Sequence, residues 1–335
     1  MRAILQKIVY LGIMSRLPLA FAAVSNVWVM LLLGRRIEEA PRRGSFIVEA
    51  PLPLLLVFAA VIALGLHIYG VALNDLLHAR YDRMFRPGRP IPSGRVQAAH
   101  AAVTAVVGLL VSLLATVFFG PVSVVICLAA AFGILIFNAV GRFFPAGGIL
   151  TLAAVRVLHM FIVNPALSFG WPAWLAMTHL ILAAAIVHRL EGKRPRLAGA
   201  EVWHVVAGWA FASLALSGWI TWRSIDAAPI PPGIWIAPLI LGGLFVAFTG
   251  WIVVRHGDEP RRARKTASWY LPLALAWMIA YDVGWLLGAG CAACVILHLC
   301  LLAAACATIP AGRWIQEATR YRPAFRVRLL TRRNT

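Results

Sequence analysis

Acidic residues are scarce in this chain. Only 12 of its 335 residues are Asp or Glu, against 31 Lys and Arg, and only five are Asp. Charged residues of all kinds make up 13% of the sequence, whereas hydrophobic residues make up 61%. Soluble globular domains carry about 25% charged residues, so this composition excludes a soluble domain of useful size. The sequence instead predicts an integral membrane protein.

Cysteine is also sparse, and its pattern excludes a disulfide framework. All five cysteines fall in apolar runs. Cys291 and Cys294 have C-x-x-C spacing, but they lie in an alanine-rich stretch without a second such pair. We interpret them as small residues in helix packing rather than as a zinc or redox site.

Apolar runs of about 17 to 25 residues, the length that spans a bilayer, recur along the chain. The weakest are the first, which contains Ser25 and Asn26, and the last pair, which only Gly288-Ala289-Gly290 separates. The runs predict an all-α polytopic membrane protein with one membrane domain at 17–309, a short N-terminal segment at 1–16 and a basic tail at 310–335. The ten predicted spans are 17–34, 51–73, 98–118, 121–140, 147–167, 170–188, 203–222, 233–254, 268–287 and 290–309.

Basic residues are unevenly distributed between the two sides of these spans. Alternate segments contain 25 of the 31 Lys and Arg, and the intervening loops contain five. By the positive-inside rule, the segments rich in Lys and Arg and both termini are expected to be cytoplasmic. We therefore expect a multi-pass protein of the cell inner (plasma) membrane. Anionic lipid head groups account for the basic loops, so membrane lipids are the expected partners and nucleic acid is not.

The most distinctive polar stretch is 74–95, which follows an apolar run. In one continuous helix, Asp75, His78 and Asp82 lie at i, i+3 and i+7 and share one face, with Asn74 beside it. Five arginines lie in the same 22 residues. Carboxylates bind hard divalent cations, and guanidinium groups bind phosphate oxygens. The stretch therefore predicts a site for a diphosphate bound with Mg²⁺.

Two segments of this stretch carry a resemblance to a known family. They read Asn74-Asp75-x-x-His78-x-x-x-Asp82 and Arg86-Pro87-Gly88-Arg89-Pro90-Ile91-Pro92-Ser93-Gly94. They resemble the first aspartate-rich motif and the following loop of the UbiA superfamily of intramembrane prenyltransferases. The resemblance implies a bundle of nine to ten transmembrane helices around a central cavity. In that family, two acidic motifs hold Mg²⁺ against a prenyl diphosphate.

Weaker similarities to the family follow in the expected order. They are Asn138-x-x-x-Arg142, Arg156-Val-Leu-His159 and the segment 188–194, where the second acidic motif is expected. By this resemblance, the residues that bind the diphosphate are Arg86, Arg89, Asn138, Arg142, Arg156, Lys193 and Arg194.

Two positions depart from the family pattern. His78 stands where the first motif usually has an acid, and Glu191 is the only carboxylate of the second segment. Imidazole is a poor ligand for Mg²⁺, which prefers oxygen. One Mg²⁺ held by Asp75, Asp82 and Glu191 is one interpretation, with Asn74 orienting the first-motif acids. In the alternative interpretation, cationic side chains take over part of the metal's task of neutralising phosphate, namely Arg80, Arg86, Arg142, Lys193 and Arg194. Three roles remain open for His78: a vestige of the motif, a hydrogen-bond donor to phosphate, or a proton acceptor.

Arg156 and Asp282 are charged residues inside predicted spans. An unpaired charge at the centre of a membrane helix costs at least ~2.5 kcal/mol on insertion scales. We therefore expect Arg156 either to face a cavity or to form a structural ion pair, for which Asp282 is a candidate.

Two functions from different classes agree with these residues. The first is a Mg²⁺-assisted transferase that moves a prenyl group from a polyprenyl diphosphate to an aromatic or other lipophilic acceptor. The second is a non-catalytic lipid-binding or carrier protein, which the changed motifs favour. Convergence of Asp75, Asp82 and Glu191 around one cation would support the enzyme. A transporter, with broken helices at matching positions of two halves, is the least favoured.

Overall fold

The computed structural model describes residues 17–37, 50–85, 87, 89–94, 96–141, 143–224, 230–256 and 259–318, and helices make up most of them. These residues form ten long helices, the seven-residue α5 (Ala79–Phe85) and two 3₁₀ turns, η1 (Val117–Phe119) and η2 (Pro232–Trp235). The long helices are α2 (Leu17–Ile37), α4 (Leu52–Leu77), α6 (Ala98–Thr116), α7 (Pro121–Val140), α8 (Pro145–Phe161), α9 (Trp171–Glu191), α10 (Ala200–Arg223), α11 (Ile236–His256), α12 (Pro260–Gly288) and α13 (Ala292–Ala318).

Each predicted span corresponds to one of these helices. Within the described ranges, nine helices are long and apolar enough to cross a bilayer, while α8, with 17 residues, is shorter. The predicted all-α, multi-pass membrane fold is therefore confirmed. The helix α13 extends to Ala318, beyond the predicted domain boundary at 309. The predicted segment 1–16 and the last part of the tail, 319–335, lie outside the described residues.

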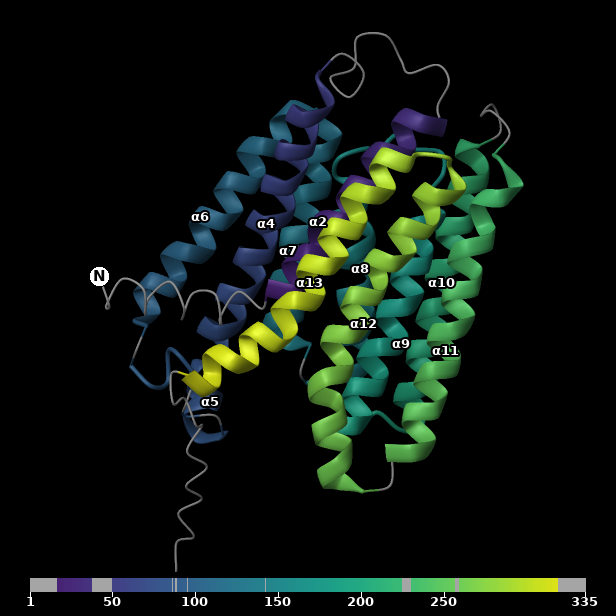
Figure 1. Ribbon diagram of the computed structural model, residues 1–335. Coiled ribbons are helices and arrows are strands. Elements are labelled where there is room, and N and C mark those ends of the chain that lie inside the picture. Colours follow the sequence, from purple (N-terminus) through teal and green to yellow (C-terminus); the bar gives the residue numbers. More distant parts are fainter. Residues whose placement is uncertain are drawn as a thin grey trace, which may run out of the picture.

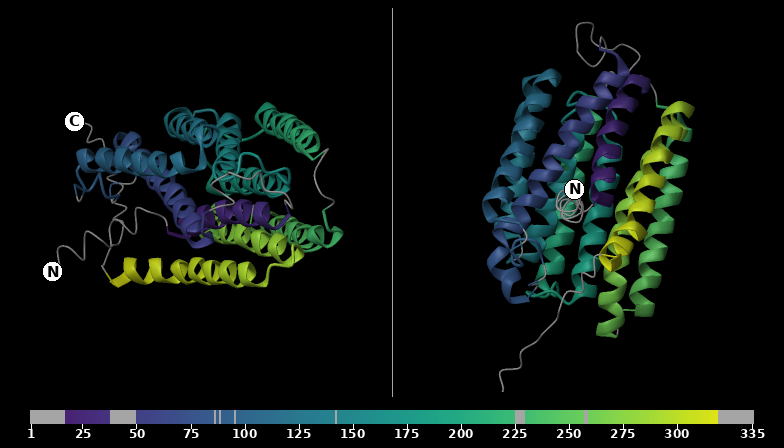
Figure 2. Two further views of the ribbon diagram at one scale, coloured as in Figure 1. Left: turned by 90° about the horizontal axis from the view of Figure 1, so that it is seen from above. Right: turned by 60° about the vertical axis from the view of Figure 1, so that its left-hand side comes forward.

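The helices form a bundle in which α12 contacts four other long helices and the turn η2. It packs against α2, α9, α11 and α13, and α13 crosses the outside of α2 and α12 as an added layer (Figures 1 and 2). The helices α7, α8 and α9 pack in sequence, and α4 pairs with α6. The short α5 lies at the lower end of the bundle in Figure 1. We call this end, where α4 and α7 finish and α8 begins, the motif end.

The tight pairing of α4 with α6 depends on two glycines. A Cβ atom added at Gly65 would collide with the Gly108 carbonyl oxygen and the Ser112 hydroxyl, and one added at Gly108 would lie 2.8 Å from the Gly65 oxygen. This close approach lets the Ser112 hydroxyl donate to the Ile62 carbonyl over 2.8 Å. Small residues promote helix association in membranes in this way, because lipid supplies no hydrophobic drive between helices.

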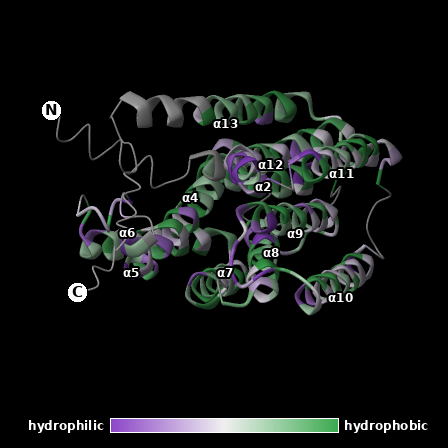
Figure 3. Ribbon diagram, turned by 90° about the horizontal axis from the view of Figure 1, so that it is seen from below, coloured by the Kyte–Doolittle hydropathy of each residue, from purple (hydrophilic) through white to green (hydrophobic). Residues whose placement is uncertain are grey.

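Large apolar side chains cover the outside of the bundle. Phe211, Leu214 and Val254 are all exposed, and the outer helices are apolar along much of their length (Figure 3). A water-soluble monomer rarely exposes so much contiguous apolar surface, whereas helices with internally paired backbones tolerate lipid contact. The surface is therefore that of a protein surrounded by lipid.

The end of the bundle opposite the motif end contains a disulfide that the sequence analysis did not predict. Cys291 and Cys294 are bonded, with their Cα atoms 5.3 Å apart. The interpretation of these cysteines as packing residues was wrong, because a tight turn after α12 brings them together at the start of α13. Arg36, near the end of α2, braces this turn by donating to the Ala289 carbonyl over 3.1 Å.

Replacing Gly65 by Leu tests the α4–α6 contact. Because backbone and Ser112 occupy the space that a side chain needs, the helices must separate, and we expect a loss of about 2 kcal/mol. The measurement is the thermal unfolding midpoint of the purified protein in detergent. Gly218→Leu on α10 is the control, since nothing lies within 4 Å of its added Cβ. Equal midpoints for the two variants would contradict the close-packing account.

Candidate active site

The first acidic motif lies on two helices, not one. The sequence predicted a continuous helix through Asp75, His78 and Asp82, but α4 ends at Leu77 and α5 begins at Ala79. His78 caps α4, and its backbone N–H still donates to the Asn74 carbonyl over 3.1 Å. The break has a physical cause: the apolar run ends here, and the turn exposes the polar side chains of α5 while Asp82 stays buried.

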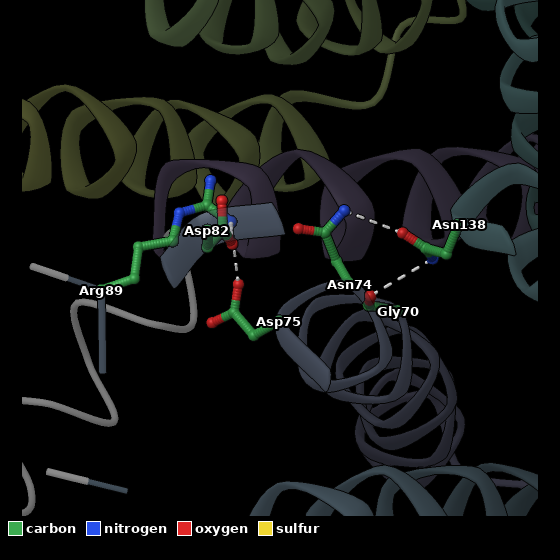
Figure 4. A network of polar contacts seen from close by, with 6 residues as sticks. All are labelled: Gly70, Asn74, Asp75, Asp82, Arg89 and Asn138. Atoms are coloured by element: carbon green, nitrogen blue, oxygen red, sulfur yellow. Dashed lines mark hydrogen bonds and ion pairs between the residues drawn. The ribbon is translucent and has the colours of Figure 1, made fainter. Parts of the chain in front are cut away.

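Both motif aspartates converge on Arg89. Its Nη1 atom lies 2.7 Å from Asp82 Oδ2 and 3.4 Å from Asp75 Oδ1 (Figure 4). Asp75 is 8% exposed and Asp82 3%, whereas the Arg89 side chain is 22% exposed. The predicted convergence of the two acids therefore holds despite the helix break, and one guanidinium group, with a single positive charge, pairs with both carboxylates.

The loop after α5 folds back to hold Arg89 at this point. The Ser93 N–H donates to the Arg89 carbonyl over 2.9 Å, and the Val96 N–H donates to the Pro90 carbonyl over 3.1 Å. Ile91 in this loop is buried. Gly94 has a φ of 74°, a left-handed conformation that glycine adopts without strain. The proline-rich sequence thus forms a compact turn rather than an open linker.

Asn138 on α7 positions Asn74. The Asn74 Nδ2 group donates to Asn138 Oδ1 over 2.9 Å, and Asn138 Nδ2 donates to the carbonyls of Ile134 and Gly70 over 2.9 and 3.4 Å (Figure 4). These contacts engage both ends of the buried Asn138 amide. Its predicted role of binding diphosphate would require this network to open, whereas a role in fixing α4 against α7 does not.

The second motif lies apart from the first. Glu191, at the end of α9, pairs with Lys193 over 2.9 Å, and both side chains are partly exposed. Gly192, with a φ of 61°, ends the helix, and Arg194 is exposed. No three His, Cys, Asp or Glu side chains come close enough to hold a metal among the residues that the structure describes. The structure thus joins Asp75 with Asp82 but does not bring Glu191 to them. Arg86 and Arg142 lie outside the described residues.

Arg156 belongs to a second polar cluster inside the bundle. Its Nη1 donates to Asn26 Oδ1 over 3.2 Å, and Asn26 Nδ2 donates to Asp282 Oδ2 over 2.7 Å. The Ser25 hydroxyl donates to the same Asp282 oxygen over 2.6 Å. Arg156 and Asp282 are therefore linked through Asn26 in place of the direct ion pair that the sequence suggested. Sequence reasoning missed Ser25 and Asn26, although two adjacent polar residues in an apolar run are the signal that marks them.

Comparison with known proteins identifies the fold. No family profile and no curated protein sequence matches the chain. Among solved structures, a digeranylgeranylglyceryl phosphate synthase structure has a TM-score of 0.57 at 15% identity, covering 86% of this chain and 99% of its own. A UbiA homologue from Aeropyrum pernix K1 in its apo form has a TM-score of 0.52 at 14% identity, covering 80% and 97%. The chain therefore has the UbiA fold, as the sequence resemblance implied.

The contact of Arg89 with Asp82 can be tested by a double-mutant cycle. Arg89→Gln leaves two buried carboxylates without their guanidinium partner, and we expect a loss of about 2 kcal/mol, reduced from fully buried cases because Arg89 is partly exposed. Adding Asp82→Asn to Arg89→Gln should recover much of that loss. The thermal unfolding midpoints of the parent, both single variants and the double variant give the coupling energy between Arg89 and Asp82. Additive effects would show that the two residues do not interact.

Proposed function

We propose that this chain is a member of the UbiA superfamily of prenyltransferases and moves a prenyl group from a polyprenyl diphosphate to a lipophilic acceptor. The observation that carries the proposal is the convergence of Asp75 and Asp82 at the motif end of a UbiA-type bundle. The loop after α5, which we call the motif loop, holds the basic side chain of Arg89 against both carboxylates. An acidic pair next to a cation, at the edge of an apolar bundle, suits a ligand with an anionic head and an apolar tail.

The two aspartates fit Mg²⁺ in the presence of a diphosphate. Mg²⁺ in such sites is usually held by one or two carboxylates, with the remaining ligands coming from water and substrate phosphates. Asp75 and Asp82 contact the same nitrogen atom of Arg89, so both are near enough to share one cation after Arg89 moves. Bound Mg²⁺ would neutralise charge on the departing diphosphate. Glu191 would contribute only if the end of α9 shifts.

The chain's own residues would divide the remaining tasks. Once released from the acids, Arg89 can donate to phosphate oxygens, the role that the sequence predicted for it. Asn138 fixes Asn74, which orients the end of α4. Apolar helices around the bound prenyl chain would exclude water and so protect an allylic cation from hydrolysis. The central cavity that the family resemblance implies stays a prediction.

A non-catalytic lipid-binding or carrier protein is the second candidate. It is favoured by the second motif, where the only carboxylate, Glu191, pairs with Lys193 instead of approaching Asp75 and Asp82. Such a protein would bind a prenyl diphosphate without releasing diphosphate from it.

We further propose that the motif end faces the cytoplasm of a cell inner (plasma) membrane. The basic segments gather on that side by the positive-inside rule. The opposite end contains the Cys291–Cys294 disulfide, and disulfides persist in oxidising compartments outside the cytoplasm. Two independent features of the chain thus favour the same orientation.

The transferase proposal predicts that diphosphate release requires both Mg²⁺ and Asp82. We expect Asp82→Asn to reduce release by at least 100-fold, because the cation loses one of its two protein carboxylates. The measurement is prenyl diphosphate binding and diphosphate release by the purified protein, with and without Mg²⁺ and across acceptor classes. Glu259→Gln is the control, since this exposed acid lies outside the motif end's acidic pair and forms a surface ion pair with Arg262. Binding without release for every acceptor would favour the carrier.

The orientation predicts which side a membrane-impermeant maleimide reaches. In intact cells, Cys291 and Cys294 should react only after treatment with a reductant, because oxidised cysteines do not alkylate. A cysteine introduced at Ser93 in the motif loop, which is exposed, should react only after the membrane is permeabilised. Labelling of the Ser93→Cys position in intact cells would place the motif end outside and reverse the proposal.

A further inference from the structure

The cluster around Arg156 lies deeper in the bundle than the motif acids. Its members come from α2, α8 and α12, which bury Asn26 and Asp282 completely or nearly so. His159 follows Arg156 by one helical turn on α8 and lies within electrostatic reach of Arg156 and of His67 on α4. His67 precedes Asp75 by eight residues of the same helix, which is about 12 Å along the axis. The bundle therefore contains two polar sites at different depths.

His159 has an unsatisfied hydrogen-bonding atom. The side chain is 6% exposed, and its Nδ1 atom has no hydrogen-bond partner among the described residues. The other buried histidine of the central helices, His179, differs. Its Nε2 lies 2.7 Å from the Ala274 carbonyl and its Nδ1 lies 3.1 Å from the Tyr281 hydroxyl. Buried polar atoms in proteins are nearly always paired, so the exception at His159 calls for a partner.

The charges around His159 point to the chemistry of that partner. Arg156 carries five N–H groups, and within the described part of the chain it makes one hydrogen bond, to Asn26. Asp282 supplies one negative charge to the same network, and its Oδ2 atom already accepts from Ser25 and Asn26. The cluster is thus electrically balanced. An anion would disturb this balance, whereas a neutral hydroxyl group would use both a guanidinium donor and the imidazole acceptor.

We propose that Arg156 and His159 bind the hydroxyl group of the lipophilic acceptor. The hydroxyl donates to His159 Nδ1, with the proton of the imidazole on Nε2, and accepts from the Arg156 guanidinium. The body of the acceptor then extends along the bundle toward Asp75 and Asp82, where the proposed diphosphate site lies. This inference rests on the proposed function, because only a transferase has an acceptor. The site itself requires only an apolar ligand with a hydroxyl group.

Binding of 2-naphthol and of its methyl ether to the protein in lipid nanodiscs tests the proposal. The two probes have similar apolar area and differ in the O–H group, and protein-free nanodiscs correct for partition into lipid. We expect the parent to bind 2-naphthol at least tenfold more tightly. A second pair, 1-dodecanol and methyl dodecyl ether, shows whether the site takes phenols, aliphatic alcohols or both. No diphosphate is present, so the result does not depend on transferase activity.

His159→Phe should abolish the preference for the hydroxyl probe. Because it removes an unpaired polar atom, it should not lower the thermal midpoint. His159→Asn, which keeps an acceptor oxygen near the Nδ1 position, should restore part of the preference and serves if the Phe variant does not fold. His179→Phe is the matched control, because both its ring nitrogens have partners. It should lower the midpoint and retain the preference.

Two results would overturn the inference. One is equal binding of hydroxyl and ether in both probe pairs by the parent. The other is a preference that survives unchanged in His159→Phe. A clear preference in a protein that never releases diphosphate would instead contradict the proposed function and leave the hydroxyl site in place.

Discussion

The absence of hydrogen-bonding solvent in the membrane determines most of this structure. Backbone groups in hydrocarbon must pair internally, so the chain forms helices throughout its spans. The same constraint applies to side chains: a polar group in the bundle is kept only where another group, or a ligand, meets it. Asp282 satisfies this rule through Ser25 and Asn26. Asp75 and Asp82 satisfy it through Arg89.

Because of this constraint, the way each polar site is paired indicates which kind of ligand it can bind. At the motif end, Arg89 offsets the aspartates from a partly exposed loop, so the partner can leave and a cation can replace it. In the deeper cluster, the charges are fixed by hydrogen bonds between α2, α8 and α12, and the buried His159 Nδ1 atom has no hydrogen-bond partner among the described residues. A movable counter-ion suits a charged ligand that binds and leaves, whereas a rigid balanced network suits recognition of a neutral group.

The fold was largely predictable because bilayer thickness sets helix length. Each apolar run of the sequence became one helix, even the first, where Ser25 and Asn26 weakened the signal. The convergence of Asp75 and Asp82 was also predictable, since helical spacing places them on one side. The break at His78 was not, because hydrophobic periodicity does not show where a chain turns at a membrane surface. The pairing of Asn26 with Asp282 joins residues 256 positions apart, and a single sequence does not contain that information.

The second motif shows why local resemblance and site geometry must be weighed separately. The position of segment 188–194 implied that Glu191 would face the first motif. In the structure Gly192 ends α9 in a left-handed turn, and Lys193 then lies close enough to neutralise Glu191. A carboxylate with an adjacent exposed cation gains little from moving toward a distant metal, since the ion pair must first be broken. Metal binding would therefore fall on Asp75 and Asp82, and phosphate binding on the arginines of the first motif. Catalysis by this chain would depend on that half of the site.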